Sequence, residues 1–401
     1  MLAVVTILAA ATATLVMALY ANRPFAQAPG LGLNAFFAFT VVGALGVPWQ
    51  TALAAVVVEG VLFIVLTAVG AREYVVGLFP KPVKFAVGTG IGLFLAIIGL
   101  QAMGIVVDDP ATLIALGSVA SNPVAILSVV GLFLTLGLYA RDVPGSIIIG
   151  IVLTTVAGWV LTRFGPISPE AGLVAGSAAV TYDITPLAGA FIDGLANVEA
   201  FTFALVVFTF FFVDFFDTAG TLVGVGQAGG FLDENGRFPD IDRPLMADAI
   251  GTTVGGALGT STVTTYIESA SGVEEGGRTG LTALTVAGLF VVSLVLVPLA
   301  AAIPLYASHI ALVVIGVVML RNVIDIEWND LTHSIPAGMT ILVMPFTYSI
   351  AYGIAAGIVS YPLVKLAAGE GRDVRAGHWA LAGAFVVYFA VRTGGVLAGQ
   401  V

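Results

Sequence analysis

The chain has 401 residues, of which 59% are hydrophobic and only 9% are charged, and its formal net charge is −10. Soluble domains carry about 25% charged residues, so this composition excludes a soluble enzyme and a nucleic-acid-binding protein. At about 20 residues per crossing, the length allows roughly a dozen spans of an all-α polytopic membrane protein. The chain contains no cysteine, which excludes disulfides and thiolate metal sites.

Apolar runs bounded by Pro, Gly or charged residues predict the membrane segments in chain order. A run of 11 apolar residues spans only ~16 Å as a helix, roughly half the hydrocarbon core. Two runs, 35–45 and 269–277, are therefore too short or too polar for ordinary spanning helices. The predicted runs are 2–20, 35–45, 49–69, 83–106, 123–140, 144–162, 198–223, 246–259, 269–277, 280–303, 306–320, 337–349, 351–367 and 379–393.

An irregular segment precedes each of these two short runs. Residues 26–34 are interrupted by Pro29 and Gly30, and residues 260–268 are rich in threonine and favour an extended strand. Irregular backbone at membrane depth requires protein or a water-filled cavity around it. A matched pair of broken crossings in the two halves indicates an inverted-repeat transporter with a site near the midplane. The alternative is a pair of re-entrant loops that only pack.

The distribution of positive charge predicts the orientation of the crossings. If the first run ends in the cytoplasm at Arg23 and each later run crosses, most of the 14 basic residues fall in cytoplasmic loops. The basic loop 369–377 is then cytoplasmic, and the protein lies in the plasma membrane as a multi-pass protein. The first run would travel from outside to inside, so we expect that a helix is missing from the start.

Five acidic residues are predicted to lie at membrane depth, four in the apolar runs and one in the second broken segment, where a charged side chain costs at least ~2.5 kcal/mol. Asp214 and Asp217 are at i and i+3 and share a helix face with two threonines, which must face a polar interior. An internal hydrogen-bonded clasp is the alternative for Asp217. We interpret two of the acids as structural. The five are Glu59, Asp214, Asp217, Asp248 and Glu268, with Glu59 and Asp248 in the structural role.

The two broken segments end in polar side chains that could meet near the midplane. Glu268 precedes a short helix expected to start at Ser269, and Asn34 precedes one expected over 35–45. Together with Asp214 they offer acceptors to N–H donors, which suits a flat, neutral ligand rich in hydrogen-bonding groups. The aromatic neighbours could supply stacking surface or only packing. These neighbours are Phe36, Phe37 and Tyr266.

Other chemistries find little support in the sequence. Neither broken segment contains a basic residue, which argues against a sulfate- or bicarbonate-type anion site. The three histidines, His309, His333 and His378, occur singly without metal-ligand spacing. The P-loop motif is also missing from the sequence, so nucleotide hydrolysis is not expected to supply the energy.

Three separated stretches resemble the signature sequences of one family. They are Gly30–Ala38, Phe212–Thr221 and Thr265–Val273. They are similar to those of AzgA-like hypoxanthine/guanine/adenine permeases, members of the nucleobase:cation symporter-two superfamily and relatives of uracil and xanthine permeases. The likeness extends over nearly the whole chain.

The resemblance implies a seven-plus-seven inverted repeat with a core and a gate domain. The third and tenth crossings, here 26–45 and 260–277, would be half strand and half helix, with purine between them. Motif match implies that Asp214, Glu268 and Asn34 contact the base and that Asp217 is essential. The family's first helix would precede the stretch matching 2–20.

The implied domain boundaries alternate along the chain, and dimerisation through the gate is a further implication. The core would comprise 1–70 (second to fourth crossings) and 166–303 (eighth to eleventh crossings). The gate would comprise 71–165 and 304–368, and 369–401 would be an extra C-terminal hydrophobic segment.

The predicted function is secondary-active import of purine nucleobases, coupled to H⁺ by alternating access. No cofactor, metal or nucleic acid is expected, and Na⁺ is the nearest alternative coupling ion. The alternative functions are an anion exchanger or passive channel on the same fold, and an intramembrane aspartyl hydrolase that pairs Asp214 or Asp217 with Asp248. The predicted substrate-binding residues are Asn34, Asp214, Glu268, Thr218, Phe36 and Tyr266, and Asp214, Asp217 and Glu268 would carry or support the proton.

Overall fold

A computed structural model describes residues 1–70, 80–165, 167–175, 181–196, 198–231, 238–266, 268–274 and 276–393. The chain forms two compact units, each assembled from separate stretches of sequence. Unit 1 comprises 1–84, 181–296 and 358–401, and unit 2 comprises 85–180 and 297–357. The expected domain boundaries at residues 71 and 166 lie outside the described residues.

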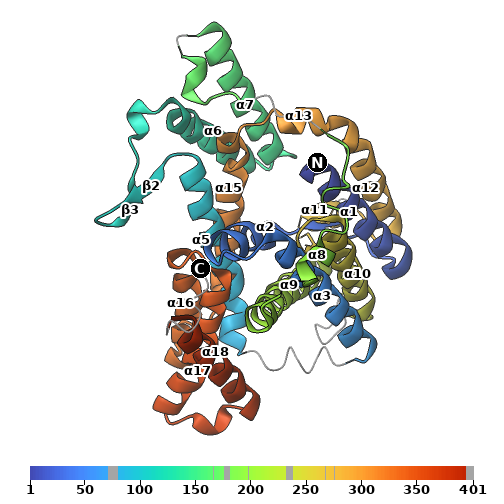
Figure 1. The fold of residues 1–401 in the computed structure, drawn as a ribbon, viewed down its shortest axis with the longest axis vertical. Helices are drawn as coiled ribbons and strands as arrows, with labels where there is room; N and C mark the ends of the chain where they lie inside the picture. Colours follow the sequence, from blue (N-terminus) through green and yellow to red (C-terminus); the bar gives the residue numbers. More distant parts are fainter. Residues whose placement is uncertain are drawn as a thin grey trace. The chain divides into compact units, whose positions relative to one another are not determined.

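Unit 1 contains the helices that surround the two broken segments (Figure 1). Helices α1 and α3 each pack closely against α10, because small buried residues such as Ala9, Ala13 and Ala54 let the backbones approach. Its elements are α1 (Leu2–Val16, extended by π-helical turns to Ala21), β1 (Gln27–Pro29), α2 (Leu31–Ala35, extended by π-helical turns to Ala44), α3 (Trp49–Ala68), α8 (Phe191–Ala196), α9 (Ala200–Ala228), α10 (Asp242–Leu258), β4 (Val263–Thr265), α11 (Ser269–Glu274), α12 (Gly280–Ser293) and α18 (Ala376–Thr393).

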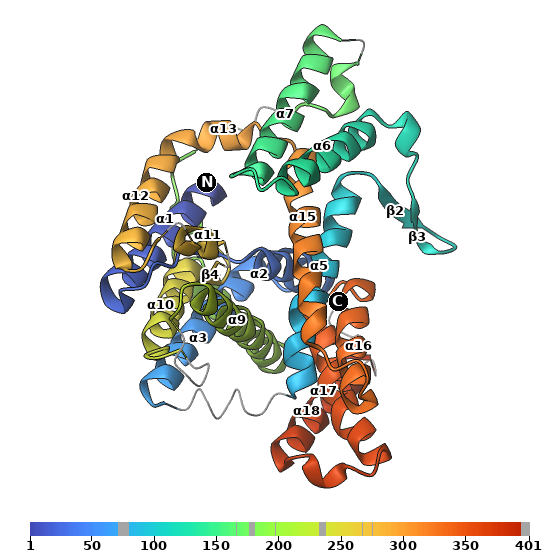
Figure 2. The same ribbon diagram turned by 180° about the vertical axis from the view of Figure 1, so that it is seen from behind.

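Unit 2 is a second group of helices with one exposed β-hairpin. Its strands, which the apolar runs did not predict, pair antiparallel from Val106↔Leu116 to Asp109↔Leu113 and extend between α5 and α6 (Figure 2). Two helices, α5 (Lys81–Ala102) and α17 (Ile350–Ala367), run from one unit into the other. The remaining elements are β2 (Val106–Asp109), β3 (Leu113–Leu116), α6 (Pro123–Tyr139), α7 (Ser146–Phe164), α13 (Val297–Ala301), α14 (Leu305–Ser308), α15 (Ile310–Met319) and α16 (Leu331–Phe346).

The helices match the apolar runs closely in position. Within the described residues, six are long and apolar enough to cross a membrane: Leu2–Ala21, Trp49–Ala68, Lys81–Ala102, Ser146–Phe164, Gly280–Ala301 and Leu305–Asp325. Shorter apolar helices include Leu31–Ala44 and Pro123–Tyr139. Because their exposed surfaces carry many large apolar side chains, such as Phe133, Leu289 and Val295, these helices suit a hydrocarbon environment.

Candidate functional site

The two broken segments pair with each other in unit 1. Strands β1 and β4 are antiparallel and wholly buried, with Gln27 opposite Thr265 and Pro29 opposite Val263. The Tyr266 N–H donates to the Ala26 carbonyl oxygen over 3.0 Å, which extends the pairing beyond the strands. This pairing satisfies backbone groups that would otherwise be orphaned at membrane depth.

A short helix follows each strand, and one of them begins earlier than the sequence predicts. Helix α11 starts at Ser269 as expected, whereas α2 starts at Leu31 and not at residue 35. Asn34 therefore lies within the first turn of α2 and not ahead of it. Its Nδ2 donates to the Pro29 carbonyl over 3.4 Å, and its Oδ1 accepts from the Ser261 hydroxyl over 2.5 Å. Asn34 thus ties the two broken segments together.

Asp217, Tyr266 and Glu268 gather where the strands give way to helices. The Tyr266 hydroxyl donates to the Pro29 carbonyl over 2.8 Å. The charges of Asp217 and Glu268 lie close enough to act on each other and on this tyrosine. Asp217 and Tyr266 are half-buried and Glu268 is exposed, so these polar groups border accessible space. Hydrogen-bond acceptors and an aromatic ring in one place suit a planar ligand with N–H groups.

Gly30 lies at the close approach between the first broken segment and α9. A β-carbon at this position would come within 2.8 Å of Thr264 Cγ2 and 3.6 Å of Asp217 Oδ2. A side chain here would force the strand pair apart, so the interruption by glycine has a packing reason. The same proximity shows that the Asp217 carboxylate lies beside the start of α2.

Asp214 occupies a different environment from Asp217. It is completely buried, and the acidic groups acting on it are Glu59, Asp248 and Asp217. Phe63 on α3 stacks on Phe211 at 4.3 Å between ring centroids, which holds α3 against this part of α9. The structure therefore brings Asp217 next to Glu268, and it places Asp214 against Glu59 on α3.

Asp248 is the centre of a buried hydrogen-bond network. Its Oδ1 accepts from the Thr218 hydroxyl at 3.0 Å, from the Thr265 N–H at 3.1 Å and from Gln27 Nε2 at 3.3 Å. A carboxylate is acceptor-only, so it satisfies these donors together. These contacts support the structural role that we interpret for Asp248 from the sequence. The Thr262 hydroxyl donates to Glu59 Oε2 over 3.5 Å in the same core.

Two of the predicted substrate-binding residues are buried in the protein core. Thr218 is fully buried, and its hydroxyl also lies 2.6 Å from that of Thr264. Phe36 is buried edge-on against Phe210, with ring centroids 5.0 Å apart. Sequence reasoning missed Gln27, whose only signal was a polar residue inside a segment flanked by apolar runs.

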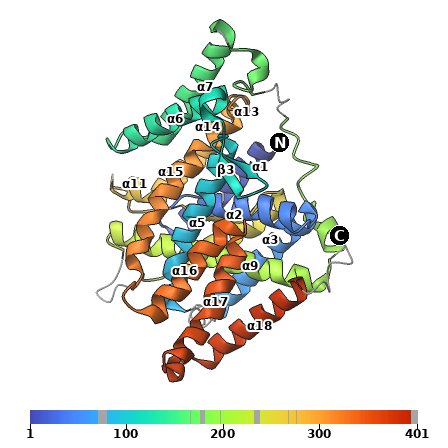
Figure 3. The ribbon, with the colours of Figure 1, turned by 90° about the vertical axis from the view of Figure 1, so that its left-hand side faces the viewer.

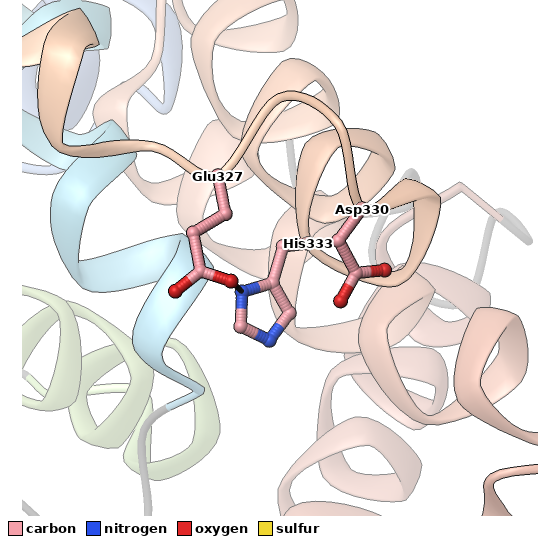
Figure 4. Close-up of side chains that lie close together, drawn as sticks. All are labelled: Glu327, Asp330 and His333. Carbon is pink, nitrogen blue, oxygen red and sulfur yellow. Dashed lines mark ion pairs between the residues drawn. The ribbon is translucent and has the colours of Figure 1, made fainter.

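Unit 2 contains a separate polar cluster between α15 and α16, shown in Figure 4. Glu327, Asp330 and His333 present side-chain ligand atoms within 4.8 Å of one another, beside an open pocket of about 490 Å³. His333 Nδ1 lies 3.3 Å from Glu327 Oε2, and Asp330 accepts from the Thr332 N–H at 2.7 Å as the N-cap of α16. The spacing of the histidines alone does not reveal this grouping, because its other two members are acids.

Comparison with known proteins identifies the family. The Permease family model, Xan_ur_permease, matches residues 1–356. The chain belongs to this permease family. The adenine permease AdeP of Escherichia coli K12 is 40% identical over 373 residues, covering 92% of this chain and 81% of AdeP. The guanine/hypoxanthine permease PbuG of Bacillus subtilis 168 is 38% identical over 384 residues, covering 96% and 85%.

The fold also resembles that of solved transporters. The transmembrane domain of the cyanobacterium bicarbonate transporter BicA aligns with a TM-score of 0.58 at 19% identity, covering 88% of each chain. The resemblance inferred from three short stretches is confirmed, and so is the inverted-repeat transporter fold. The permease is therefore a multi-pass membrane transport protein whose relatives include purine nucleobase permeases.

Proposed function

We propose that this permease imports purine nucleobases by H⁺ symport, with the base bound at the junction of β1, β4 and α9. The observation that carries the proposal is the meeting of Asp217, Tyr266 and Glu268 beside the paired broken segments. The hypoxanthine, guanine and adenine transport named for the relatives supports the same substrate class.

In this proposal the acids recognise the N–H edge of the base. Glu268 is exposed beside the strand end and accepts a hydrogen bond from a ring N–H, while Tyr266 offers its ring for stacking. Asn34 holds the first broken segment in register through Ser261. Asp214, Thr218 and Phe36 act from the surrounding core, where they support the site without facing open space.

Proton coupling in this proposal uses the carboxyl groups of the same region. Asp217 and Glu268 lie close enough for their negative charges to repel each other. One proton bound by the pair would relieve this repulsion. Asp214 against Glu59 forms a second, buried acid pair that stores or relays the proton. Na⁺ is the alternative coupling ion, since carboxylates and threonine hydroxyls are also ligands for hard cations.

We further propose that unit 1 is the core domain and unit 2 the gate. Alternating access is then movement of one unit against the other around the site. The protein would lie in the plasma membrane with loop 369–377 in the cytoplasm, and a second copy would dock through the gate. Unit 1 also includes the C-terminal segment beyond residue 369.

An anion exchanger or passive channel is the alternative function. The fold of the BicA domain is compatible with it. Residues 26–45 and 260–277 contain no lysine or arginine, however, and the acids at the junction would repel an anion. The arrangement of charge therefore favours a neutral base over an anion.

Uptake into proteoliposomes tests the proposal. The 401-residue chain would be assayed with radiolabelled hypoxanthine, adenine, guanine and uracil under an inward H⁺ gradient, an inward Na⁺ gradient or neither. Purine should accumulate above equilibrium only with the H⁺ gradient. Glu268→Gln should abolish this accumulation, whereas the matched surface variant Glu170→Gln should not, because Glu170 is exposed in a loop.

Each other outcome changes the proposal in a defined way. Accumulation driven by the Na⁺ gradient would show that Na⁺, and not H⁺, is the coupling ion. Equilibration without response to either gradient would indicate a channel. If no base binds or enters, and bicarbonate or sulfate exchanges instead, the substrate class is wrong.

A further inference from the structure

A cluster of basic residues lies at one end of unit 1, apart from the paired strands. The N-terminal end of α5 and the N-terminal end of α18 come together there, as Figures 2 and 3 show. Lys81 and Arg375 are the charged groups acting on Lys84, and Arg375 and Lys84 act on His378. We call this group the basic cluster: Lys81, Lys84, Arg375 and His378.

The local balance of charge is positive. Like charges brought together repel each other, so an arrangement that gathers them needs a compensating anion or abundant water. The preceding loop contains two acids, and one of them, Glu370, is already paired with Lys365 at 2.5 Å. Asp373 is exposed, and it lies near the cluster because it and Arg375 both act on Tyr361. A net positive charge therefore remains at this end of the unit.

His378 adds a buried polar side chain to this charged surface. Its side chain is only 7% exposed, and Nδ1 is buried with no hydrogen-bond partner among the described residues. The ring is held edge-on against Tyr361, with centroids 5.3 Å apart at 88°. A buried imidazole nitrogen without a partner is unfavourable, and a ligand that accepts a hydrogen bond from Nδ1–H would satisfy it.

The start of α18 adds donors to the same place. This helix is 18 residues long and begins at Ala376, so its first N–H groups and the positive end of its dipole lie next to Arg375 and His378. Helix N-termini bind anions for this reason. Trp379, which is 39% exposed on the next position, is the residue type that marks the level of lipid headgroups.

We propose that the basic cluster binds a phosphate group at the membrane surface, presented either by an anionic phospholipid headgroup or as a free phosphate. Arg375 holds the phosphate oxygens by its fork of donors, Lys84 supplies charge from the partly buried side, and His378 donates from Nδ1. Clusters of this kind next to a membrane helix are the physical basis of lipid headgroup recognition. The site is independent of purine transport.

Lipid binding to the purified full chain tests the proposal. Dioleoylphosphatidylglycerol and dioleoylphosphatidylcholine would be titrated onto the detergent-purified protein and followed by native mass spectrometry. We expect phosphatidylglycerol to bind at one site more tightly than the zwitterionic lipid. Removing one charge by Lys84→Gln or Arg375→Gln should weaken it about fivefold, and Lys84→Arg should retain binding.

Two further variants separate a built site from diffuse surface charge. His378→Phe keeps the ring packing against Tyr361 but removes Nδ1, and it should weaken phosphatidylglycerol about fivefold. Arg141→Gln removes an exposed arginine from a loop outside the cluster, and it should leave the affinity unchanged. Thermal unfolding of each variant would confirm that the fold is retained.

Inorganic phosphate identifies the source of the phosphate group. Displacement of the lipid by phosphate, but not by chloride of equal ionic strength, would support a site open to both sources. Lipid binding without displacement would assign the site to the headgroup, and phosphate binding alone would assign it to the free anion. The proposal is overturned if neither binds, or if Arg375→Gln and His378→Phe bind as well as the parent.

Discussion

At the scale of single residues, acidic side chains occupy very different environments within one small region. Asp248 is buried and satisfied by Thr218, Thr265 and Gln27, whereas Glu268 is exposed beside the strand end. Removing a buried acceptor leaves several donors unpaired, while removing an exposed one leaves the fold intact. The contacts of Asp248 therefore suit a role in holding the fold, whereas the proposed function assigns the contact with the base to Glu268.

Tyr266 provides a test of the proposed base site. We expect Tyr266→Ala to weaken hypoxanthine binding about tenfold, because it removes both the ring and the hydroxyl that donates to Pro29. Tyr266→Phe keeps the ring and should lose less, about fivefold. Equilibrium binding of radiolabelled base to purified protein measures both effects. Tyr20→Ala, at a tyrosine that is 51% exposed, is the control, and equal affinities for all four proteins would remove Tyr266 from the site.

At the scale of elements, strand β1 is tied to α1 by the side chain of Thr14. The Thr14 hydroxyl donates to the Gln27 carbonyl and accepts from the Gln27 N–H, both at 2.9 Å. A three-residue strand is too short to be stable by itself. Its position therefore depends on α1 on one side as well as on β4 on the other.

This dependence predicts that Thr14→Val is strongly destabilising. The change leaves a buried N–H and C=O of Gln27 unpaired, which should lower the free energy of unfolding by about 2–4 kcal/mol. The matched control is Thr12→Val, because the Thr12 hydroxyl bonds only to Leu8 of its own helix. Thermal unfolding in detergent, followed by tryptophan fluorescence, compares the two. Equal unfolding midpoints for the two variants would show that the hydrogen bonds between Thr14 and Gln27 do not stabilise the protein.

Helix α12 approaches α1 so closely that one of its positions admits only glycine. A β-carbon on Gly280 would lie 2.1 Å from the Ala18 carbonyl oxygen, and the Gly280 N–H donates to Asn22 Oδ1 over 2.9 Å. Gly280→Ala should therefore destabilise the protein by about 1–3 kcal/mol. Gly288→Ala, where no atom lies within 4 Å, should be neutral or stabilising because alanine favours helix. The same unfolding assay measures both, and the reverse order would contradict this packing.

At the scale of the whole molecule, each unit is built from stretches far apart in the chain. Unit 1 joins residues 1–84 with 181–296 and 358–401. Neither the first nor the second half of the sequence can complete a unit alone. Folding of unit 1 therefore requires long-range pairing of the two broken segments, whose strands are separated by more than 200 residues.

The proposed orientation can be tested because the chain contains no cysteine. Each introduced cysteine is then the only reactive thiol in the protein. Arg372→Cys, in the loop proposed to be cytoplasmic, should react with an impermeant maleimide only after the cells are permeabilised. Asp183→Cys is exposed in the loop after run 144–162, which lies outside if each run crosses in turn, and it should react in intact cells. The opposite pattern would invert the topology.

The sequence alone determined the class of the protein and most of its elements. Hydropathy is a local property, so apolar runs predict helices well. Run 49–69 corresponds to α3 within one residue. Run 280–303 begins with α12, which is followed by a 3₁₀ turn. The threonine-rich stretch predicts β4, and Ser269 predicts the start of α11. The predicted start of α2 was wrong by four residues. Leu31 and Gly32 join the helix because the preceding strand ends at Pro29, where it pairs with β4.

Only the tertiary structure decided which neighbours surround each acid. Asp214 and Asp217 lie one turn apart, yet one faces Glu59 and the other faces Glu268. These partners come from distant segments, and a helical face does not specify which neighbour will cover it. The same holds for Asn34 with Ser261 and for Lys84 with Arg375. A side chain's chemistry depends on burial and on its charged neighbours, and both are set by contacts that local sequence does not encode.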